Sequence, residues 1–155
     1  MSAPIYDCST EGARSLTTGA KSLLGVKAHA NSGLQVVGFR LGFIGVTASE
    51  VPASVELCYC TWATNSPGTN STSTTPRQRN GRVLTAGFTS GTLWTTEPTT
   101  VTALQEFPLT PNGGLVILDV PLSTEPDCAL AEGFVLRVNT TATVSARGTI
   151  SVTRI

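Results

Sequence analysis

Alternation of apolar and polar residues is clearest over residues 144–155 of the chain. Small or apolar residues occupy the even positions up to 152, and polar residues occupy the odd positions from 145 to 153. Successive side chains of a strand point to opposite faces of a sheet, so this pattern predicts a strand with one face in a core. Because a terminal segment frays unless it is tied down, we expect this strand to lie inside a sheet. The predicted core face is Val144, Ala146, Gly148, Ile150 and Val152.

Six further runs rich in Val, Ile, Leu and Thr predict strands, at residues 23–30, 34–45, 54–62, 101–109, 114–122 and 132–140. Gly, Pro, Asn and Asp separate these runs and favour turns. No stretch carries the 3.6-residue apolar repeat of an amphipathic helix. The sequence therefore predicts an all-β fold, an antiparallel β-sandwich of jelly-roll or Greek-key type with about seven to eight strands. We expect residues 1–155 to form a single domain.

Two segments depart from the strand pattern. Residues 1–18 are expected to form an N-terminal arm or edge strand, because Pro4 has no amide hydrogen to give to a ladder. Residues 63–100 are dominated by Thr, Ser, Asn, Gly, Pro and Arg, and they predict a long loop. Loops of this length are uncommon in compact domains and are usually functional or disordered. We expect this one to be ordered and anchored by Phe88 and Trp94.

The charge balance argues against two kinds of partner. Ten Lys and Arg residues balance ten Asp and Glu residues, so no net field attracts nucleic acid or an anionic membrane surface. The longest apolar runs are far shorter than the roughly 20 residues that cross a bilayer, and no signal segment is recognisable, so we expect synthesis in a cytoplasm. Only 13% of the residues are charged, which suggests that a partner or other copies of the chain cover part of the surface.

The inventory of catalytic groups is thin. His29 is the single histidine, so any Ser-His-Asp or Cys-His arrangement would have to use it. Asp119, Glu125, Asp127 and Glu132 could form a glycosidase pair or a calcium site, but solvated turns explain them better. Glycine-rich nucleotide-binding motifs are absent. We therefore expect no enzyme, and no catalytic, cofactor or metal site.

Cysteine and tryptophan residues leave alternatives open. Cys58 and Cys60 fall on one face of the strand predicted at 54–62, and Cys8 and Cys128 are isolated. Buried free thiols are expected, with a disulfide or a metal site as the alternative. Trp62 and Trp94 are either buried anchors or an aromatic platform for a sugar. The basic cluster at residues 76–82 either grips acidic groups of a partner or keeps the loop solvated.

Three stretches resemble a group of small structural proteins of tailed bacteriophages. They are a Thr-rich loop ending in Thr-Pro at residues 68–76, the Glu-Pro-Thr segment at 96–99, and the closing pair of strands at 133–150. The resemblance implies a β-sandwich virion component, usually a homotrimer, that decorates or cements the capsid without catalysis. The major capsid protein would be its partner, and the outside of the capsid its location. The alternative that it implies is a receptor- or carbohydrate-binding module of a head fibre or tail.

The arm and the long loop are the segments expected to reach beyond a compact sandwich. They are therefore expected to provide the contacts with the partner. The residues assigned to this role are Ile5, Tyr6, Arg77, Arg79, Arg82 and Trp94.

Overall fold

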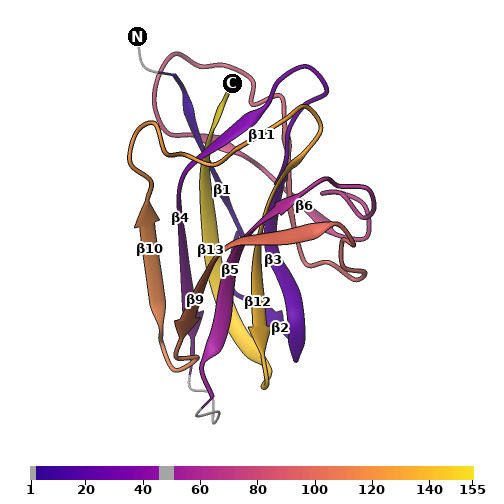
Figure 1. Cartoon of the computed structure of the whole chain (residues 1–155), viewed down its shortest axis with the longest axis vertical. Helices are drawn as coiled ribbons and strands as arrows, with labels where there is room; N and C mark the ends of the chain where they lie inside the picture. The colour runs from indigo at the N-terminus through magenta and orange to yellow at the C-terminus, as the bar shows by residue number, and fades with distance from the viewer. Residues whose placement is uncertain (1–2, 46–50) are drawn as a thin grey trace.

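Two antiparallel β-sheets packed face to face make up the computed structural model, which describes residues 3–45 and 51–155 (Figure 1). The predicted all-β class is confirmed, since the described part of the chain contains strands and no helix. Sheet A runs in the order β10 (Leu115–Asp119), β4 (Leu34–Ile44), β13 (Val144–Arg154), β1 (Ile5–Ser9) and β7 (Arg77–Gln78). Sheet B runs in the order β6 (Thr72–Thr74), β8 (Thr89–Thr92), β3 (Gly19–Lys27), β12 (Gly133–Thr140), β5 (Ala53–Cys60) and β9 (Val101–Leu109). The short strands β2 (Arg14–Leu16) and β11 (Asp127–Cys128) pair with β13 and β4.

Strand β13 occupies the middle of sheet A, as its sequence pattern predicts. It pairs with β4 along one edge and with β1 and β2 along the other. All five residues predicted for its core face are buried. The strand predicted at residues 101–109 matches β9 end to end, and the other predicted runs overlap β3, β4, β5, β10 and β12. The described residues form thirteen strands, more than the seven to eight expected, and eight of them have five residues or more.

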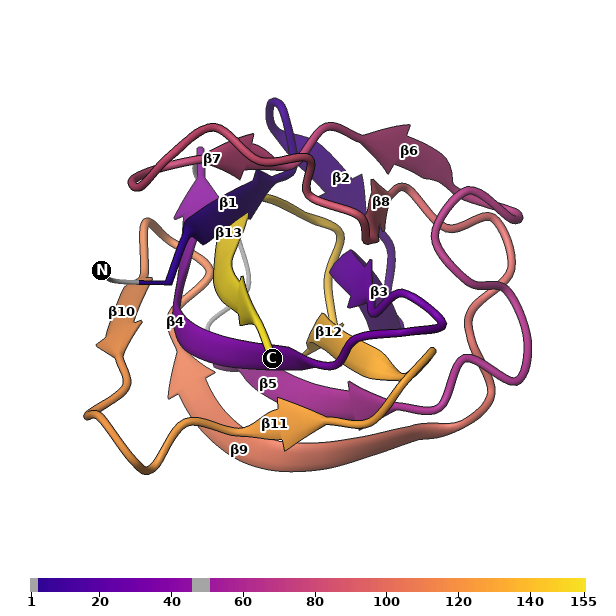
Figure 2. The same ribbon diagram turned by 90° about the horizontal axis from the view of Figure 1, so that it is seen from above.

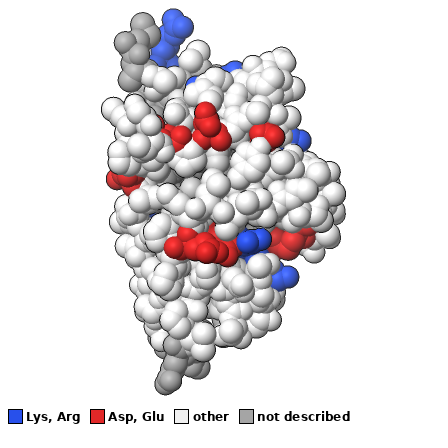
Figure 3. Space-filling model, viewed as in Figure 1, with Lys and Arg blue, Asp and Glu red and all other residues white. Residues whose placement is uncertain are grey.

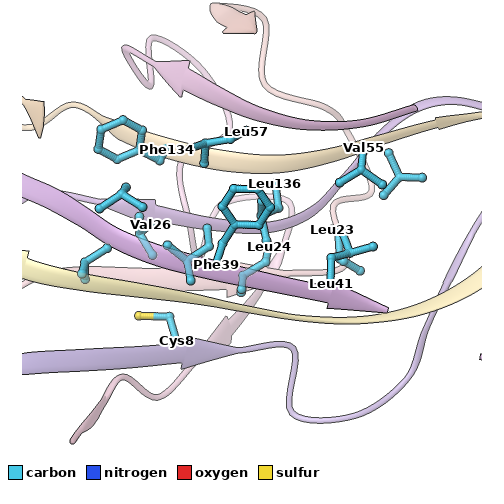
Figure 4. Close-up of a cluster of buried hydrophobic side chains, with 14 of the residues drawn as sticks. Cys8, Leu23, Leu24, Val26, Phe39, Leu41, Val55, Leu57, Phe134 and Leu136 are labelled. Atoms are coloured by element: carbon cyan, nitrogen blue, oxygen red, sulfur yellow. The ribbon is translucent and has the colours of Figure 1, made fainter. Parts of the chain in front are cut away.

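The core lies between the two sheets and receives side chains from both (Figure 4). Phe39 and Leu41 of β4 meet Leu24 of β3 and Leu136 of β12, and each is at most 1% exposed. Each fully buried side chain of this size contributes roughly 1.5–3 kcal/mol relative to its exposed state. Burial of both inner faces therefore holds the sheets together without any disulfide among the described residues.

Of the two forms expected for residues 1–18, the structure has strands at residues 5–9 and 14–16 and not a projecting arm there. Residues 5–9 form β1 and residues 14–16 form β2, both paired with β13. Tyr6 and Cys8 alternate toward the core and are 1% and 0% exposed. Two apolar side chains spaced for one face of a strand gain more from burial than a projecting arm would allow.

The long segment 63–100 is ordered and contributes strands to both sheets. β6 and β8 extend sheet B beside β3, and β7 extends sheet A beside β1. Seen from above, the segment wraps around one side of the sandwich, away from β10 (Figure 2). Phe88 is 7% exposed in the core and packs edge-on against Tyr6, which confirms that it anchors the segment.

A second, smaller apolar cluster lies outside the main core. Cys58 and Cys60 of β5 and Val135 of β12 are buried there beside Trp62, with Trp94 packed against them. Both faces of β5 are therefore largely buried, because Trp62 and, from the segment 63–100, Trp94 cover the outer face of sheet B.

Candidate interaction surface

Strand β10 carries two large apolar side chains that face solvent. It lies at the end of sheet A, where β4 is its only neighbour in the described structure. Leu115 is 61% exposed and Ile117 is 56% exposed, whereas Val116 and Leu118 alternate toward the core. Ile44, in the neighbouring strand β4, is 40% exposed. We call Ile44, Leu115, Ile117 and the free edge of β10 the β10 surface.

The backbone of β10 is open for pairing. Phe43 N–H donates to the Gly114 carbonyl, and Val120 N–H donates to the Val37 carbonyl. In an antiparallel ladder this places the even-numbered residues toward β4, so Leu115, Ile117 and Asp119 direct their amides and carbonyls outward. Natural edge strands are usually protected by Lys, Pro or a bulge. β10 has no Lys or Pro, and its register with β4 runs unbroken.

The edge of sheet B lies on the same side of the sandwich. Strand β9 pairs only with β5 among the described strands, and a turn connects its end to β10 (Figures 1 and 2). Leu104 of β9 is 48% exposed. Phe107 and Leu118 are half-buried against the core from the two edges. This side therefore offers apolar contact area from both sheets, whereas β6, β7 and β8 extend the sheets on the side wrapped by residues 63–100.

Three charged side chains, Arg40, Asp119 and Arg147, adjoin the β10 surface. Arg40 of β4 lies 3.6 Å from the Asp119 carboxylate, and both side chains are largely exposed. A cavity of about 310 Å³ on the outer face of sheet A is lined by Leu115, Ile44 and Arg147. Figure 3 shows the face of the sandwich on which β5 and β9 lie, whose surface is mostly uncharged and carries acidic side chains in bands.

The six residues predicted to contact a partner lie in two separate places. Pairing of β1 with β7 brings Ile5, Arg77 and Arg79 together at the edge of sheet A that lies far from β10. Arg82 is exposed in the same region. Tyr6 belongs to the core at 1% exposure, so its ring offers no contact surface. Trp94 lies apart from all of these residues, against sheet B.

Arg79 is engaged within the fold rather than free to bind a partner. Its Nε donates to Asp7 Oδ2 at 2.9 Å, and its Nη2 donates to Ser151 Oγ at 2.7 Å. Burial pushes the pKa of Asp7 upward, but the hydrogen bonds from Arg79 and Ser151 outweigh burial and hold that pKa below its ordinary value. The pair therefore fastens residue 79 to β1 and β13.

The two tryptophan rings stack on each other. Their centroids lie 6.0 Å apart with an interplanar angle of 15°. The Trp62 indole N–H donates to the Val26 carbonyl at 3.1 Å, and the Trp94 indole N–H donates to the Asn65 carbonyl at 2.8 Å. Trp62 is 6% exposed, so it is a buried anchor and the sugar platform proposed for it is wrong. Trp94 is half-buried and keeps part of its surface in contact with solvent.

The residues weighed for catalysis are spread over several elements. His29 is exposed, and its Nδ1 accepts a hydrogen bond from the Asn31 amide. Asp119 lies on the β10 edge, whereas Asp127 lies in β11. Across residues 3–45 and 51–155, no group of His, Cys, Asp and Glu side chains is arranged to hold a metal ion. The described part of the chain also contains no helix that could span a bilayer.

The four cysteines are buried free thiols. Burial raises the pKa of Cys8 and of Cys58 to about 12, and that of Cys128 to about 11. Burial also raises the pKa of Cys60. A thiol that stays protonated is a poor nucleophile, so these side chains act as small core residues.

No protein-family model, curated protein or solved structure matches this chain. The β10 surface escaped the sequence analysis, although the sequence contains a signal for it. Residues 115–118 are four consecutive apolar residues in an antiparallel strand, where one face is ordinarily polar. Such a run indicates that something covers both faces.

Proposed function

We propose that this protein is a structural component of a tailed-phage virion that decorates and stabilises the outside of the capsid as a homotrimer, without catalysis. The resemblance of residues 68–76, 96–99 and 133–150 to small phage structural proteins motivates the capsid location and the major capsid protein as partner. The observation that carries the proposal is the unprotected apolar edge of β10. In a protein that remained a monomer, such an edge would invite aggregation.

A three-fold arrangement gives both sheet edges a partner. With the side that carries β9 and β10 facing the symmetry axis, β10 of one copy meets β9 of the next copy through side chains, because Pro108 and the bulge at Leu104 interrupt the edge of β9. This contact is heterologous, so it closes into a ring when each step turns by a third of a circle. The exposed side chains Leu115 and Ile117 on one edge and Leu104 on the other would be buried there. The ring would then bind the capsid lattice through many copies, whose avidity adds up.

The strand order supports the jelly-roll type of sandwich, which we propose as part of the same assignment. Numbered along the chain, the eight strands of five residues or more are β1, β3, β4, β5, β9, β10, β12 and β13. Sheet A then has the order 6-3-8-1, and the main strands of sheet B have the order 2-7-4-5. Jelly rolls are built from eight strands in two such sheets and are frequent in viral capsid proteins. An experimental structure without β13 between β4 and β1 would refute the assignment.

The proposal is tested by light scattering of the purified chain and by its binding to separated phage heads. We expect trimers that bind heads, and far more copies in the head fraction of virions than in the tail fraction. Ile117→Lys places a charge on the edge and is expected to give monomers. Leu130→Lys is the matched control, because Leu130 is 55% exposed in a turn outside both edges. A wild-type chain that is monomeric and ignores heads contradicts the proposal.

The second candidate function is a receptor- or carbohydrate-binding module of a head fibre or tail. It is favoured by a cavity of about 330 Å³ beside Trp94. Cavities of this size suit small ligands. The absence of binding to every member of a panel of immobilised glycans would argue against this function.

A further inference from the structure

The cavity beside Trp94 lies where the two sheets approach each other on the side wrapped by residues 63–100. Its walls come from three segments: β2 of sheet A, the beginning of β3 of sheet B, and residues 93–97 after β8. Figures 1 and 2 show β2 well away from β10. A ligand in this cavity would therefore leave the β10 surface free.

Neither positive charge in the wall forms an ion pair with an acidic side chain of the described residues, although the Glu97 carboxylate belongs to the same wall. The ion pairs among the described residues are Arg40–Asp119, Arg79–Asp7 and Arg137–Glu56, so Arg14 and Lys21 take part in none. Arg14 Nε donates to the Thr10 carbonyl at 2.9 Å, which leaves the two terminal nitrogens of its guanidinium for a ligand. Arg14 and Lys21 outnumber Glu97, so the wall carries a net positive charge that favours an anionic group in the ligand.

The rest of the wall combines a rigid apolar surface with hydroxyl groups. Leu93 has a φ of 56°, a left-handed conformation that non-glycine residues rarely adopt, and it leads directly into Trp94. The stack on Trp62 and the hydrogen bond to the Asn65 carbonyl then hold the Trp94 ring in place. The hydroxyl groups belong to Ser15, Thr17 and Thr95.

Glu97 supplies a fixed acceptor at the same cavity. Its Oε2 accepts the Ser22 amide hydrogen at 2.9 Å, and its other carboxylate oxygen remains available to ligand hydroxyls. An immobilised carboxylate accepts hydrogen bonds from sugar hydroxyls without a further loss of side-chain freedom.

We propose that this cavity binds an acidic sugar, a saccharide residue that carries a carboxylate. The carboxylate meets Arg14 and Lys21, the apolar C–H face of the ring lies on Trp94 and Leu93, and the hydroxyls bind Glu97 and the Ser and Thr side chains. Inorganic phosphate fits less well, because it has no apolar face for the tryptophan wall. This inference rests on the second candidate function, sugar binding.

The test compares methyl β-glucuronide with methyl β-glucoside, which differ only in the carboxylate. Binding to the full chain is followed by calorimetry and by the NMR signal of the Trp94 indole N–H. We expect the glucuronide to bind at least about tenfold more tightly than the glucoside. Arg14→Ala and Lys21→Ala should each weaken glucuronide binding by about tenfold or more, because each removes a charge-assisted hydrogen bond.

Two matched variants serve as controls. Arg154 donates to one backbone carbonyl, as Arg14 does, but does so at the Thr85 carbonyl outside the cavity. Lys27 is the other lysine of the chain and lies at the far end of β3 from Lys21. Arg154→Ala and Lys27→Ala are expected to bind glucuronide as the wild type does.

Four outcomes would overturn the inference. Equal binding of both sugars would remove the acidic preference while leaving sugar binding intact. Phosphate that binds as tightly as glucuronide would assign the cavity to simple anions. Equal weakening in the control variants would show a nonspecific charge effect. Finally, the lack of saturable binding by either sugar would refute both this inference and the second candidate function.

Discussion

The ion pair between Glu56 and Arg137 offers a sharp test of how sheet B is stabilised. The two residues face each other across β5 and β12, and Arg137 Nε donates to Glu56 Oε2. Their side chains are 8% and 25% exposed. On the other side of β5, Glu106 of β9 lies directly opposite Glu56. Like charges in directly opposite positions destabilise a sheet, so Arg137 offsets the repulsion between Glu56 and Glu106.

We expect loss of Arg137 and loss of the Glu56 charge to lower the free energy of unfolding by different amounts. Arg137→Met leaves the Glu56 carboxylate buried opposite Glu106, with only the Cys58 thiol within 3.9 Å as a weak donor. Loss of the partner of a buried charge costs about 3–5 kcal/mol. Glu56→Gln keeps an acceptor of the same shape, and Arg137 also interacts electrostatically with Glu106. We therefore expect Glu56→Gln to cost about 1–3 kcal/mol, the range for one buried polar group that loses its best partner.

The double variant Glu56→Leu with Arg137→Met removes both charges together. Apolar residues of similar volume in place of a buried pair are often neutral or stabilising, so its free energy of unfolding should return close to the wild-type value. Urea titration at pH 7 and one fixed protein concentration measures all three variants, since association changes apparent stability. The reasoning is refuted if Glu56→Gln costs more than Arg137→Met, or if the double variant is less stable than both single variants.

Three further predictions concern single groups. Asp7→Asn should destabilise the protein at pH 7, because the lowered pKa of Asp7 contributes stability that is full above the ordinary aspartate pKa of about 3.9. The difference from wild type should vanish as the pH falls through the lowered native pKa in chemical denaturation, and a constant difference down to acid would contradict this. Gly133→Ala should lower the thermal midpoint strongly, because a Cβ there would overlap the Val26 carbonyl oxygen and lie 2.7 Å from Trp62 Nε1; an unchanged midpoint by circular dichroism refutes the packing. Native protein should resist iodoacetamide and take up four adducts only in urea, since all four thiols are buried; fast native labelling detected by mass spectrometry is the opposite result.

The long strands were predictable because each carries its own signal. In β13 the alternation of core and solvent residues persists for most of the strand, and β9 is bounded by turn residues on both sides. β2, β6, β7, β8 and β11 are two to four residues long, too short for any periodicity to show. They form because neighbouring strands present free edges. The choice between an arm and an edge strand stayed open for β1, because its pairing partner lies at the other end of the sequence.

The candidate surface could be predicted only in part. The apolar run at residues 115–118 predicts a strand, but its exposure depends on β10 being the last strand of sheet A, which is a property of the whole topology. Likewise Arg79 looked free in the sequence, and only the pairing of β7 with β1 shows that Asp7 holds it. Local patterns report local structure, whereas availability for a partner depends on contacts between distant segments.

The pairing of β1 with β13 has a kinetic consequence. Ile5 faces Thr153, and the Thr153 hydroxyl donates to the Pro4 carbonyl across 149 positions of sequence. Folding rates fall as contacting residues become more distant along the chain, because a long loop must close before the contact stabilises anything. During synthesis, β1 has no β13 to pair with until β13 has left the ribosome, so Tyr6 and Cys8 are expected to stay unpacked until then. Nascent chains are therefore most prone to aggregation in the interval before their last strand emerges.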